Sequence, residues 1–383
     1  MDVAVIGAAM TPFGERAAWL DELLSTAALD CLADAGASTG AVDHLYVSNM
    51  ASGEFEGTTG VMNALAADIG VTPAYTQRVG QTSASGGAGL YAAWQSIASG
   101  ASELTLLVGG EKMTHRTTGE ASDIIASLTH PVEYSHGVTL PSFAGLVARR
   151  YMDRFDVPRE SLAEVAVKNH ANATANPDAQ FRKAIDTDDV LSSPVVADPL
   201  RLYDYCPVTD GAGALLFCPA AVAEQYTDRY VRLSGVAGGT DTHVVHERAE
   251  PTWMGAVAES GRQAFEMAGC EPSDIDVAEL HDMVTLLEPL QLEALGFADR
   301  GTGWQWAPEG RTTRDGSLPV NTSGGLKARG HPLGATGIAQ AVEIYRQLLG
   351  EAGGRQVTAR RGLTCNVGGF GNCVTTAVLE VDG

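Results

Sequence analysis

The sequence predicts an α/β fold built from two similar halves, with one long segment inserted into the first half. Two observations carry this prediction: stretches of the chain repeat in the same order, and the repeats read as alternating strands and helices. A chain of 383 residues can hold two or three domain-sized units. A duplicated strand–helix unit predicts layered sheets and helices around shared apolar cores.

The first repeated unit joins a helix to a strand. The apolar stretch "VAVIGAAM" (3–10) predicts an opening strand. Further on, "CLADAGASTGAVDHLYVSNM" (31–50) aligns without gaps with "AFEMAGCEPSDIDVAELHDM" (264–283). In both copies an apolar helix pattern, an Ala-Gly turn and an acidic residue precede a strand pattern. We therefore expect a helix and then a strand at both places.

The second repeated unit is a helix that begins at glycines. The stretch "SASGGAGLYAAWQSIASG" (83–100) resembles "HPLGATGIAQAVEIYRQLLG" (331–350). Glycines occupy two matching positions before each amphipathic pattern, which allows the backbone to come close to a neighbour. We expect these helices to begin at equivalent points of the two halves.

Two strand patterns complete each half. "LLVGG" (106–110) matches "CNVGG" (365–369), and "GAGALLFCP" (211–219) matches "GNCVTTAVLE" (371–380). In the second half these strands nearly adjoin, whereas about a hundred helix-rich residues separate them in the first. Insertions on a scaffold tend to carry function, so we interpret this segment as a lid or ligand-binding subdomain. The predicted division is residues 1–110 plus 210–228 for the first half, 111–209 for the inserted loop domain and 229–383 for the second half.

The composition narrows the class of protein. The net charge is −22, with 47 Asp and Glu against 25 Lys and Arg, and the surface should repel nucleic acid and anionic membranes. An acidic surface with few lysines suits the high-salt cytoplasm of a halophilic organism. The alternative is a mildly acidic protein from a GC-rich genome. The six cysteines form no CxxC pair, which indicates free thiols in a reduced, cytoplasmic protein and no metal site. No basic N-terminal region or long apolar run indicates export or a membrane span.

The hydroxyl of Ser83 is the first candidate for chemistry. It stands directly before the predicted helix, whose partial positive charge would stabilise an alkoxide or an oxyanion. Serines at this place are more often simple helix caps, and that alternative stays open on the residues alone.

Two histidines and one glycine-rich turn are the other candidates. His281 ends an apolar strand in "ELHDM", and His331 lies between a glycine-rich loop and a helix in "GGLKARGHPLGATG". No GK[ST] or GxGxxG pattern supports nucleotide binding here. The turn in "CNVGGFGN" offers backbone amides for an oxyanion hole, so a hydroxyl, two imidazoles and these amides would suit acyl transfer.

Several stretches resemble the thiolase superfamily. "NTSGGLKARGHPLGATG" (321–337) is similar to the motif around the catalytic histidine of sterol-carrier-protein-x type and archaeal thiolases (acetyl-CoA acetyltransferases, or beta-ketothiolases). "HDM" (281–283) resembles the HDCF segment of that group, and residues 145–177 and 193–216 resemble further stretches. The resemblance covers essentially the whole chain. It implies the thiolase fold, two βαβαβαββ-type halves in α-β-α-β-α layers with an inserted loop domain.

The family implies an acyl-CoA C-acyltransferase with acyl-CoA thioesters as substrates and no cofactor or metal. Its nucleophile is a cysteine in a segment like N-A-C-A-S-G, and here "QTSASG" (81–86) places Ser83 at that position. The HDCF cysteine is replaced by Met283. The remaining acid/base cysteine of the family aligns with Asn366, next to Cys365.

The resemblance assigns roles to the candidates in this sequence. Ser83 would carry the acyl group and His331 would activate it. His281 would line a second oxyanion site and, without an acid/base cysteine, would take the α-proton of the second substrate. The amides of Ser83 and Gly368 would form the acyl oxyanion hole.

Other functions fit the same residues. A non-catalytic scaffold that binds coenzyme A would explain the missing cysteines, and a thiolase-like retro-aldolase acting on CoA esters also lacks the nucleophilic cysteine. A decarboxylating ketoacyl synthase shares the fold but would usually keep a cysteine. Retention of His331 favours acyl transfer.

The family also implies partners. We expect a homodimer or tetramer and, as in archaeal relatives, a small OB-fold, zinc-ribbon protein subunit. Coenzyme A is anionic, so the scarce cations of an acidic chain should gather near its site. The candidates in the inserted segment are Lys112, Arg116, Arg149, Arg150, Arg182 and Lys183.

Overall fold

The computed structural model describes residues 1–127 and 129–381, and its centre is a mixed β-sheet. Nine strands follow the order β3-β2-β4-β7-β1-β8-β11-β10-β9 in this part of the chain. The strands of this sheet are β1 (Val3–Met10), β2 (His44–Ser48), β3 (Tyr75–Val79), β4 (Thr105–Glu111), β7 (Gly211–Pro219), β8 (Val231–Thr240), β9 (Val277–Leu280), β10 (Arg361–Gly368) and β11 (Cys373–Glu380). A separate pair, β5 (Val195–Ala197) and β6 (Leu200–Arg201), lies in the inserted segment.

The sheet contains the same arrangement twice. In the first half β2 is parallel to β4, which is antiparallel to β7, which is antiparallel to β1. In the second half β9, β10, β11 and β8 are paired in the same way. A parallel bridge between Ala278 and Val320 lies where the first half has β3. Antiparallel pairing of β1 with β8 joins the halves edge to edge, so that the two expected sheets are continuous.

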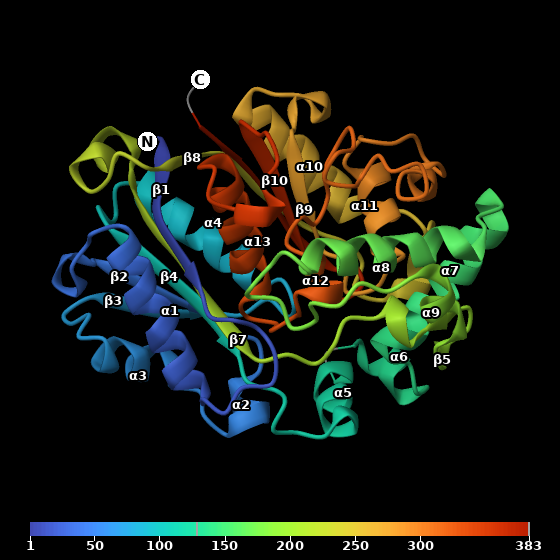
Figure 1. Cartoon of the computed structure of the whole chain (residues 1–383). Coiled ribbons are helices and arrows are strands. Elements are labelled where there is room, and N and C mark those ends of the chain that lie inside the picture. The colour runs from blue at the N-terminus through green and yellow to red at the C-terminus, as the bar shows by residue number, and fades with distance from the viewer. Residues whose placement is uncertain (128, 382–383) are drawn as a thin grey trace.

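Helices cover the sheet in layers (Figure 1). The α-helices are α1 (Leu20–Asp34), α2 (Ser52–Glu56), α3 (Val61–Asp68), α4 (Ser85–Ala98), α5 (Thr118–Ala126), α6 (Pro131–Ser135), α7 (Leu140–Phe155), α8 (Arg159–Ala173), α9 (Thr187–Ser192), α10 (Gly255–Ala268), α11 (Leu287–Ala294), α12 (Gly325–Ala328) and α13 (Thr336–Leu348). Helix α1 packs on the first half, α10 on the second, and α4 and α13 lie side by side between them. Across the described residues, none of these helices has the length and apolarity needed to cross a membrane.

The sequence of strand β1 is almost wholly apolar because both faces of the strand are buried. Ala4 and Ile6 pack in the core under α1, whereas Val3 and Val5 pack in the central core with α4 and α13. Alternate side chains of a strand point to opposite faces, and here both faces are covered. The resulting α-β-α-β-α layering is the thiolase fold expected from the sequence.

The glycines that begin α4 and α13 allow these helices to touch. A Cβ on Gly86 would lie 2.7 Å from the amide nitrogen of Gly337, and a Cβ on Gly337 would lie 2.3 Å from that of Gly87. Real side chains cannot come so close, so the contact requires glycine. It brings the start of one helix, with Ser83, against the start of the other, with His331.

The inserted segment contributes α5 to α9 and lies beside the second half (Figure 1). Its longest helix, α7, begins where Thr139 accepts a hydrogen bond from the Ser142 amide and ends at Asp156, whose φ is 53°. Such a cap and a left-handed end are ordinary helix boundaries. The helices expected in this segment are therefore present.

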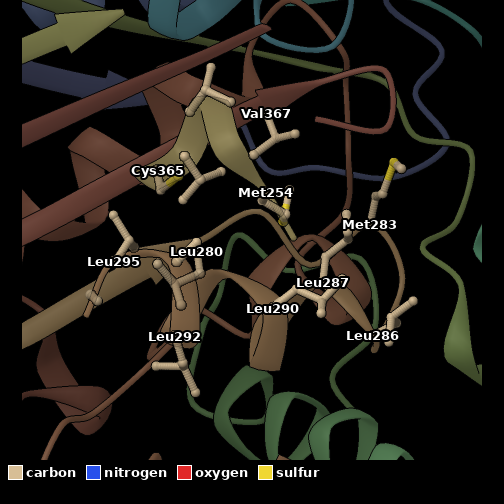
Figure 2. Close-up of a cluster of buried hydrophobic side chains, with 14 of the residues drawn as sticks. Met254, Leu280, Met283, Leu286, Leu287, Leu290, Leu292, Leu295, Cys365 and Val367 are labelled. Atoms are coloured by element: carbon tan, nitrogen blue, oxygen red, sulfur yellow. The ribbon is translucent and has the colours of Figure 1, made fainter. Parts of the chain in front are cut away.

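The second half has an apolar core between β9, β10 and α11. Leu280, Leu295 and Cys365 pack in it, with Met283 at its edge (Figure 2). The core fixes the end of β9, and the next residue along the chain is His281.

Candidate active site

Ser83 lies in a tight turn before α4. The preceding residue, Thr82, has a φ of 49°, a left-handed conformation that is uncommon for a residue other than glycine. The hydroxyl of Ser85 stabilises the turn, since it donates to the Thr82 carbonyl at 2.6 Å and accepts from the Gln81 amide at 2.9 Å. Ser85 therefore serves this helix start. The Ser83 hydroxyl is hydrogen-bonded to no side chain or backbone group among the described residues and is left for other chemistry.

His331 is held as a neutral imidazole with a free Nε2. Its Nδ1 lies 2.6 Å from the Thr336 hydroxyl, which donates its only proton to the Pro332 carbonyl at 2.9 Å. With the hydroxyl proton in that bond, Nδ1 carries its own proton and donates it to Thr336. Nε2 then holds a lone pair, and within the described chain no group is bonded to this buried atom. His331 is thus prepared to accept a proton.

His281 is held in the opposite tautomer by Asn366. The Asn366 carbonyl oxygen accepts from the Gly87 amide at 2.9 Å, which fixes the orientation of the side-chain amide. Its nitrogen therefore donates to Nδ1 of His281 at 3.1 Å. Because Nδ1 accepts, the proton of neutral His281 is on Nε2. That buried Nε2 also has no partner in the described residues and can donate to an oxygen of a substrate.

The two imidazoles lie together. Their ring centroids are 5.0 Å apart and the ring planes cross at 89°. Burial, followed by the charge of Arg329, lowers the pKa of His331 to about 3. Burial also lowers the pKa of His281 well below its ordinary value, with the charges of His331 and Arg329 adding to the effect. Both rings are therefore neutral at neutral pH.

Asn366 also links this pair to the serine loop. Its side-chain nitrogen lies 3.4 Å from the Ser83 carbonyl oxygen. Gly368 packs on the same loop, because a Cβ there would lie 2.3 Å from Oγ1 of Thr82. The structure thus brings together Ser83, His281, Asn366 and the turn at Gly368.

A large cavity opens onto Ser83 and His331. Its volume is about 480 Å³, and its lining is mainly apolar and includes Met283, Leu333 and residues from the start of α7. A second cavity of about 40 Å³ is also lined by Ser83, together with Phe143 and Phe370. Ser83 therefore lines both a large and a small cavity.

Three asparagines, two in α8 and one just after it, form hydrogen bonds to the loops that carry His281 and lead to His331. Asn169 donates to the Asp282 carboxylate at 2.6 Å, next to His281. Asn172 and Asn176 donate to the carbonyls of Asn321 and Ser323 at 3.0 and 2.8 Å. These asparagines face one side of the segment at helical spacing, so the inserted segment braces the loop that leads to His331. This role was not predicted from the sequence, although the spacing of the asparagines was visible there.

Two of the expected groups do not join the site. Cys365 points away from it, because neighbouring residues of β10 face opposite sides. Its side chain lies in the apolar core of Figure 2, where the Thr376 hydroxyl donates to the sulfur at 3.8 Å. Lys112 is buried and forms a 2.7 Å ion pair with Asp210, so it is not available to a phosphate.

The other cations considered for coenzyme A are not gathered at the cavity. Arg116 donates to the Phe55 carbonyl, and Arg149 pairs with Asp198 on the surface. Arg150, Arg182 and Lys183 are exposed. In the described part of the chain, no three His, Cys, Asp or Glu side chains are arranged to hold a metal ion.

A hydroxyl at a helix start beside two neutral imidazoles is equipped for acyl transfer. Comparison with known families agrees with such a class of enzyme. Residues 3–221 match "Thiolase, N-terminal domain" and residues 237–381 match "Thiolase C-terminal domain-like". The chain belongs to the thiolase family.

Individual proteins and solved structures are also similar to this chain. It is 42% identical to an acetyl-CoA acetyltransferase of Methanothermobacter thermautotrophicus, with 99% of both chains covered. It is 33% identical to sterol carrier protein 2 of Homo sapiens, over 98% of this chain and 71% of that protein. Among solved structures, "Ltp2-ChsH2(DUF35) aldolase" superposes with a TM-score of 0.87 at 26% identity, over 100% of this chain and 98% of that one.

Proposed function

We propose that this thiolase is an acyl-CoA C-acyltransferase that carries the acyl group on Ser83. The observation that carries the proposal is the cavity shared by the Ser83 hydroxyl and His331, whose free Nε2 can accept the hydroxyl proton. The full-length similarity to acetyl-CoA acetyltransferases supports acetyl-CoA as a substrate.

In the first step Ser83 Oγ attacks the thioester carbonyl carbon while its proton moves to Nε2 of His331. The tetrahedral oxyanion accepts hydrogen bonds from the amides of Ser83 and Gly368, at the positive end of α4. The C–S bond then breaks, the coenzyme A thiolate takes the proton from His331, and an oxygen ester remains on Ser83. Burial disfavours the imidazolium form of His331, and the oxyanion formed at the same time offsets part of that cost.

In the second step an acetyl-CoA loses an α-proton and attacks the acyl-enzyme. The tautomers favour His331 as the base, because its Nε2 is again a lone pair once the first coenzyme A has left. His281 donates its Nε2 proton in a hydrogen bond to the enolate oxygen. This reassigns the proton transfer that the sequence suggested for His281. The new C–C bond forms as the Ser83 oxygen leaves and takes the proton from His331.

Labelling of the acyl-enzyme tests the proposal. Wild-type protein, Ser83→Ala and Ser83→Cys are incubated with radiolabelled acetyl-CoA in molar KCl, and the peptide containing residue 83 is isolated. We expect label on Ser83, none on Ser83→Ala, and equal or faster acetoacetyl-CoA thiolysis by Ser83→Cys. Unchanged thiolysis by Ser83→Ala would refute the serine intermediate. Binding of coenzyme A without label or turnover would instead favour the scaffold function.

A retro-aldolase is the second candidate, because the aldolase structure superposes on the whole chain at a TM-score of 0.87. Thiolysis consumes coenzyme A thiol, whereas retro-aldol cleavage releases a carbonyl compound without it. Cleavage of a β-hydroxyacyl-CoA in the absence of free coenzyme A would identify the aldolase. The DUF35 component of that structure supports our expectation of a small OB-fold, zinc-ribbon partner. Assays with and without a co-expressed partner test that expectation, and sedimentation tests the expected homodimer or tetramer.

A further inference from the structure

Glu111 connects three separate parts of the molecule. It ends β4, and its side chain is fully buried. Its Oε1 accepts hydrogen bonds from the Asn49 side chain at 2.9 Å and the Ala51 amide at 3.0 Å. Its Oε2 accepts from the amides of Met50 at 2.9 Å and Gly334 at 3.0 Å. One carboxylate thus ties the loop after β2 to the turn that follows His331.

The contact to Gly334 fixes one end of the His331 turn. The other end is held where the His331 amide donates to the Thr209 hydroxyl at 3.1 Å. Between these two anchors the chain turns into α13, whose first residue, Thr336, sets the tautomer of His331. Glu111 belongs to the half of the molecule that carries Ser83. It therefore anchors the turn after His331, which belongs to the other half.

We propose that Glu111 is a positioning residue that places His331 against Ser83 through its hydrogen bond to the Gly334 amide. This inference rests on the proposed roles of Ser83 and His331. Glu111 touches neither reacting group, and it acts on the rate by holding the turn. The sequence alone offered no sign of this role, because the four hydrogen bonds come from residues 49–51 and Gly334, which lie far from Glu111 in the chain.

The anchor depends on the ionisation of Glu111. Four N–H donors surround the carboxylate, and an ionised carboxylate only accepts. Protonation would turn one acceptor into an O–H group that faces an N–H, so one of the four bonds would be lost. Burial raises the pKa of Glu111 to about 7, although the backbone hydrogen bonds and the charge of Arg78 oppose the rise. Arg78 on β3 is the charged group that faces this site, and it donates to the Met50 carbonyl at 3.0 Å.

The catalytic rate should therefore fall as the pH drops through about 7. The imidazoles cannot produce this fall, because burial holds the pKa of both well below the ordinary value. Burial also raises the pKa of Glu279 to about 7, so an acid limb is assigned to the anchor by its loss in Glu111→Gln.

Kinetics of Glu111→Gln test the proposal, with Glu103→Gln, an exposed residue just before β4, as the matched control. We expect kcat to fall at least 10-fold with KM within 2-fold, and the acid limb between pH 6 and 8 to disappear. Glu103→Gln should behave like the wild type. Wild-type kcat and an unchanged pH profile in Glu111→Gln would overturn the proposal, as would a wild-type enzyme with no acid limb.

A second measurement does not depend on turnover. In protein labelled with ¹³C-histidine, the His331 signal is assigned with His331→Asn. We expect it to shift with pH around 7 in the Ser83→Ala background and to stay constant in Ser83→Ala with Glu111→Gln. A His331 signal that ignores pH in the parent protein would overturn the positioning role. If Ser83 carries no acyl group but the signal shifts as expected, only the proposed function fails. Should Glu111→Gln not fold, the titration of the parent protein alone decides.

Discussion

Asn366 and His281 are joined by a hydrogen bond of 3.1 Å in which the amide nitrogen donates to Nδ1. The same amide accepts from Gly87 at the start of α4, so its orientation is fixed by the half of the molecule that bears Ser83. A residue aligned with an acid/base cysteine of the family therefore makes its neighbouring histidine a hydrogen-bond donor.

Asn366→Asp should reverse this tautomer. A carboxylate accepts from the Nδ1 proton of His281, which leaves Nε2 without a proton to donate to an oxyanion. Loss of one such donor lowers kcat by about 10²-fold. Steady-state thiolysis of acetoacetyl-CoA measures the effect, and Asn63→Asp on the exposed side of α3 adds the same charge as a control. An unchanged kcat in Asn366→Asp would contradict the assignment.

Thr336→Val should slow acylation of Ser83 by about 10-fold, because it removes the acceptor that holds the proton on Nδ1 of His331. Thr336→Ser keeps the hydroxyl and should retain most of the rate. Rapid mixing with labelled acetyl-CoA separates acylation from the later steps. Equal acylation rates in both variants would show that the hydroxyl does not set the tautomer.

Lys112→Ala should destabilise the fold rather than weaken coenzyme A binding. It would leave Asp210 buried without its 2.7 Å partner, which typically costs about 3–5 kcal/mol. Arg149→Ala removes an exposed pair with Asp198 and should cost less than about 1 kcal/mol. Urea unfolding measures both. A raised KM for coenzyme A with normal stability in Lys112→Ala would return this lysine to the substrate site.

The contribution of buried Glu111 and Glu279 to the free energy of unfolding should fall as the pH rises from about 4.5 to about 7. Burial raises the pKa of Glu111 and of Glu279 from 4.5 to about 7, so in this range the folded state holds protons that the unfolded state has released. Glu111 alone accounts for about 3 kcal/mol across the window. The depressed pKa values of His281 and His331 act in the opposite direction, so urea unfolding at pH 5 and pH 8 is compared between the wild type and Glu111→Gln. The wild type should lose stability relative to Glu111→Gln between these two pH values, and a relative gain would contradict the sign.

The sequence predicted the doubled fold because strand and helix periods and repeated glycines are local features. It also indicated Ser83, His281 and His331 as candidates, since small residues and histidines stood at equivalent ends of repeated elements, and their catalytic roles stay a prediction. The role of Lys112 could not be predicted, because its partner Asp210 lies far away along the chain. Cys365 and Asn366 are neighbours in a strand, and the side chains of neighbouring strand residues point to opposite faces. This difference between them could have been predicted once residues 365–369 were interpreted as a strand.

The roles of Glu111 and of the asparagines of α8 depend on which buried donors meet in three dimensions. The sequence does not show which groups a single carboxylate or amide contacts in the folded protein. Tertiary contacts, rather than any local pattern, decide whether such a group lies on the surface or anchors a loop.

The glycine contact between α4 and α13 has a consequence for the history of the chain. In the proposed mechanism the two copies perform different tasks, since one supplies a nucleophile and the other a base, and neither works without the other. Because no side chain separates the helices, a residue with a Cβ in either copy would force the other to yield. The two copies could therefore acquire different chemical groups after duplication, but the glycines at their contact had to be kept in both.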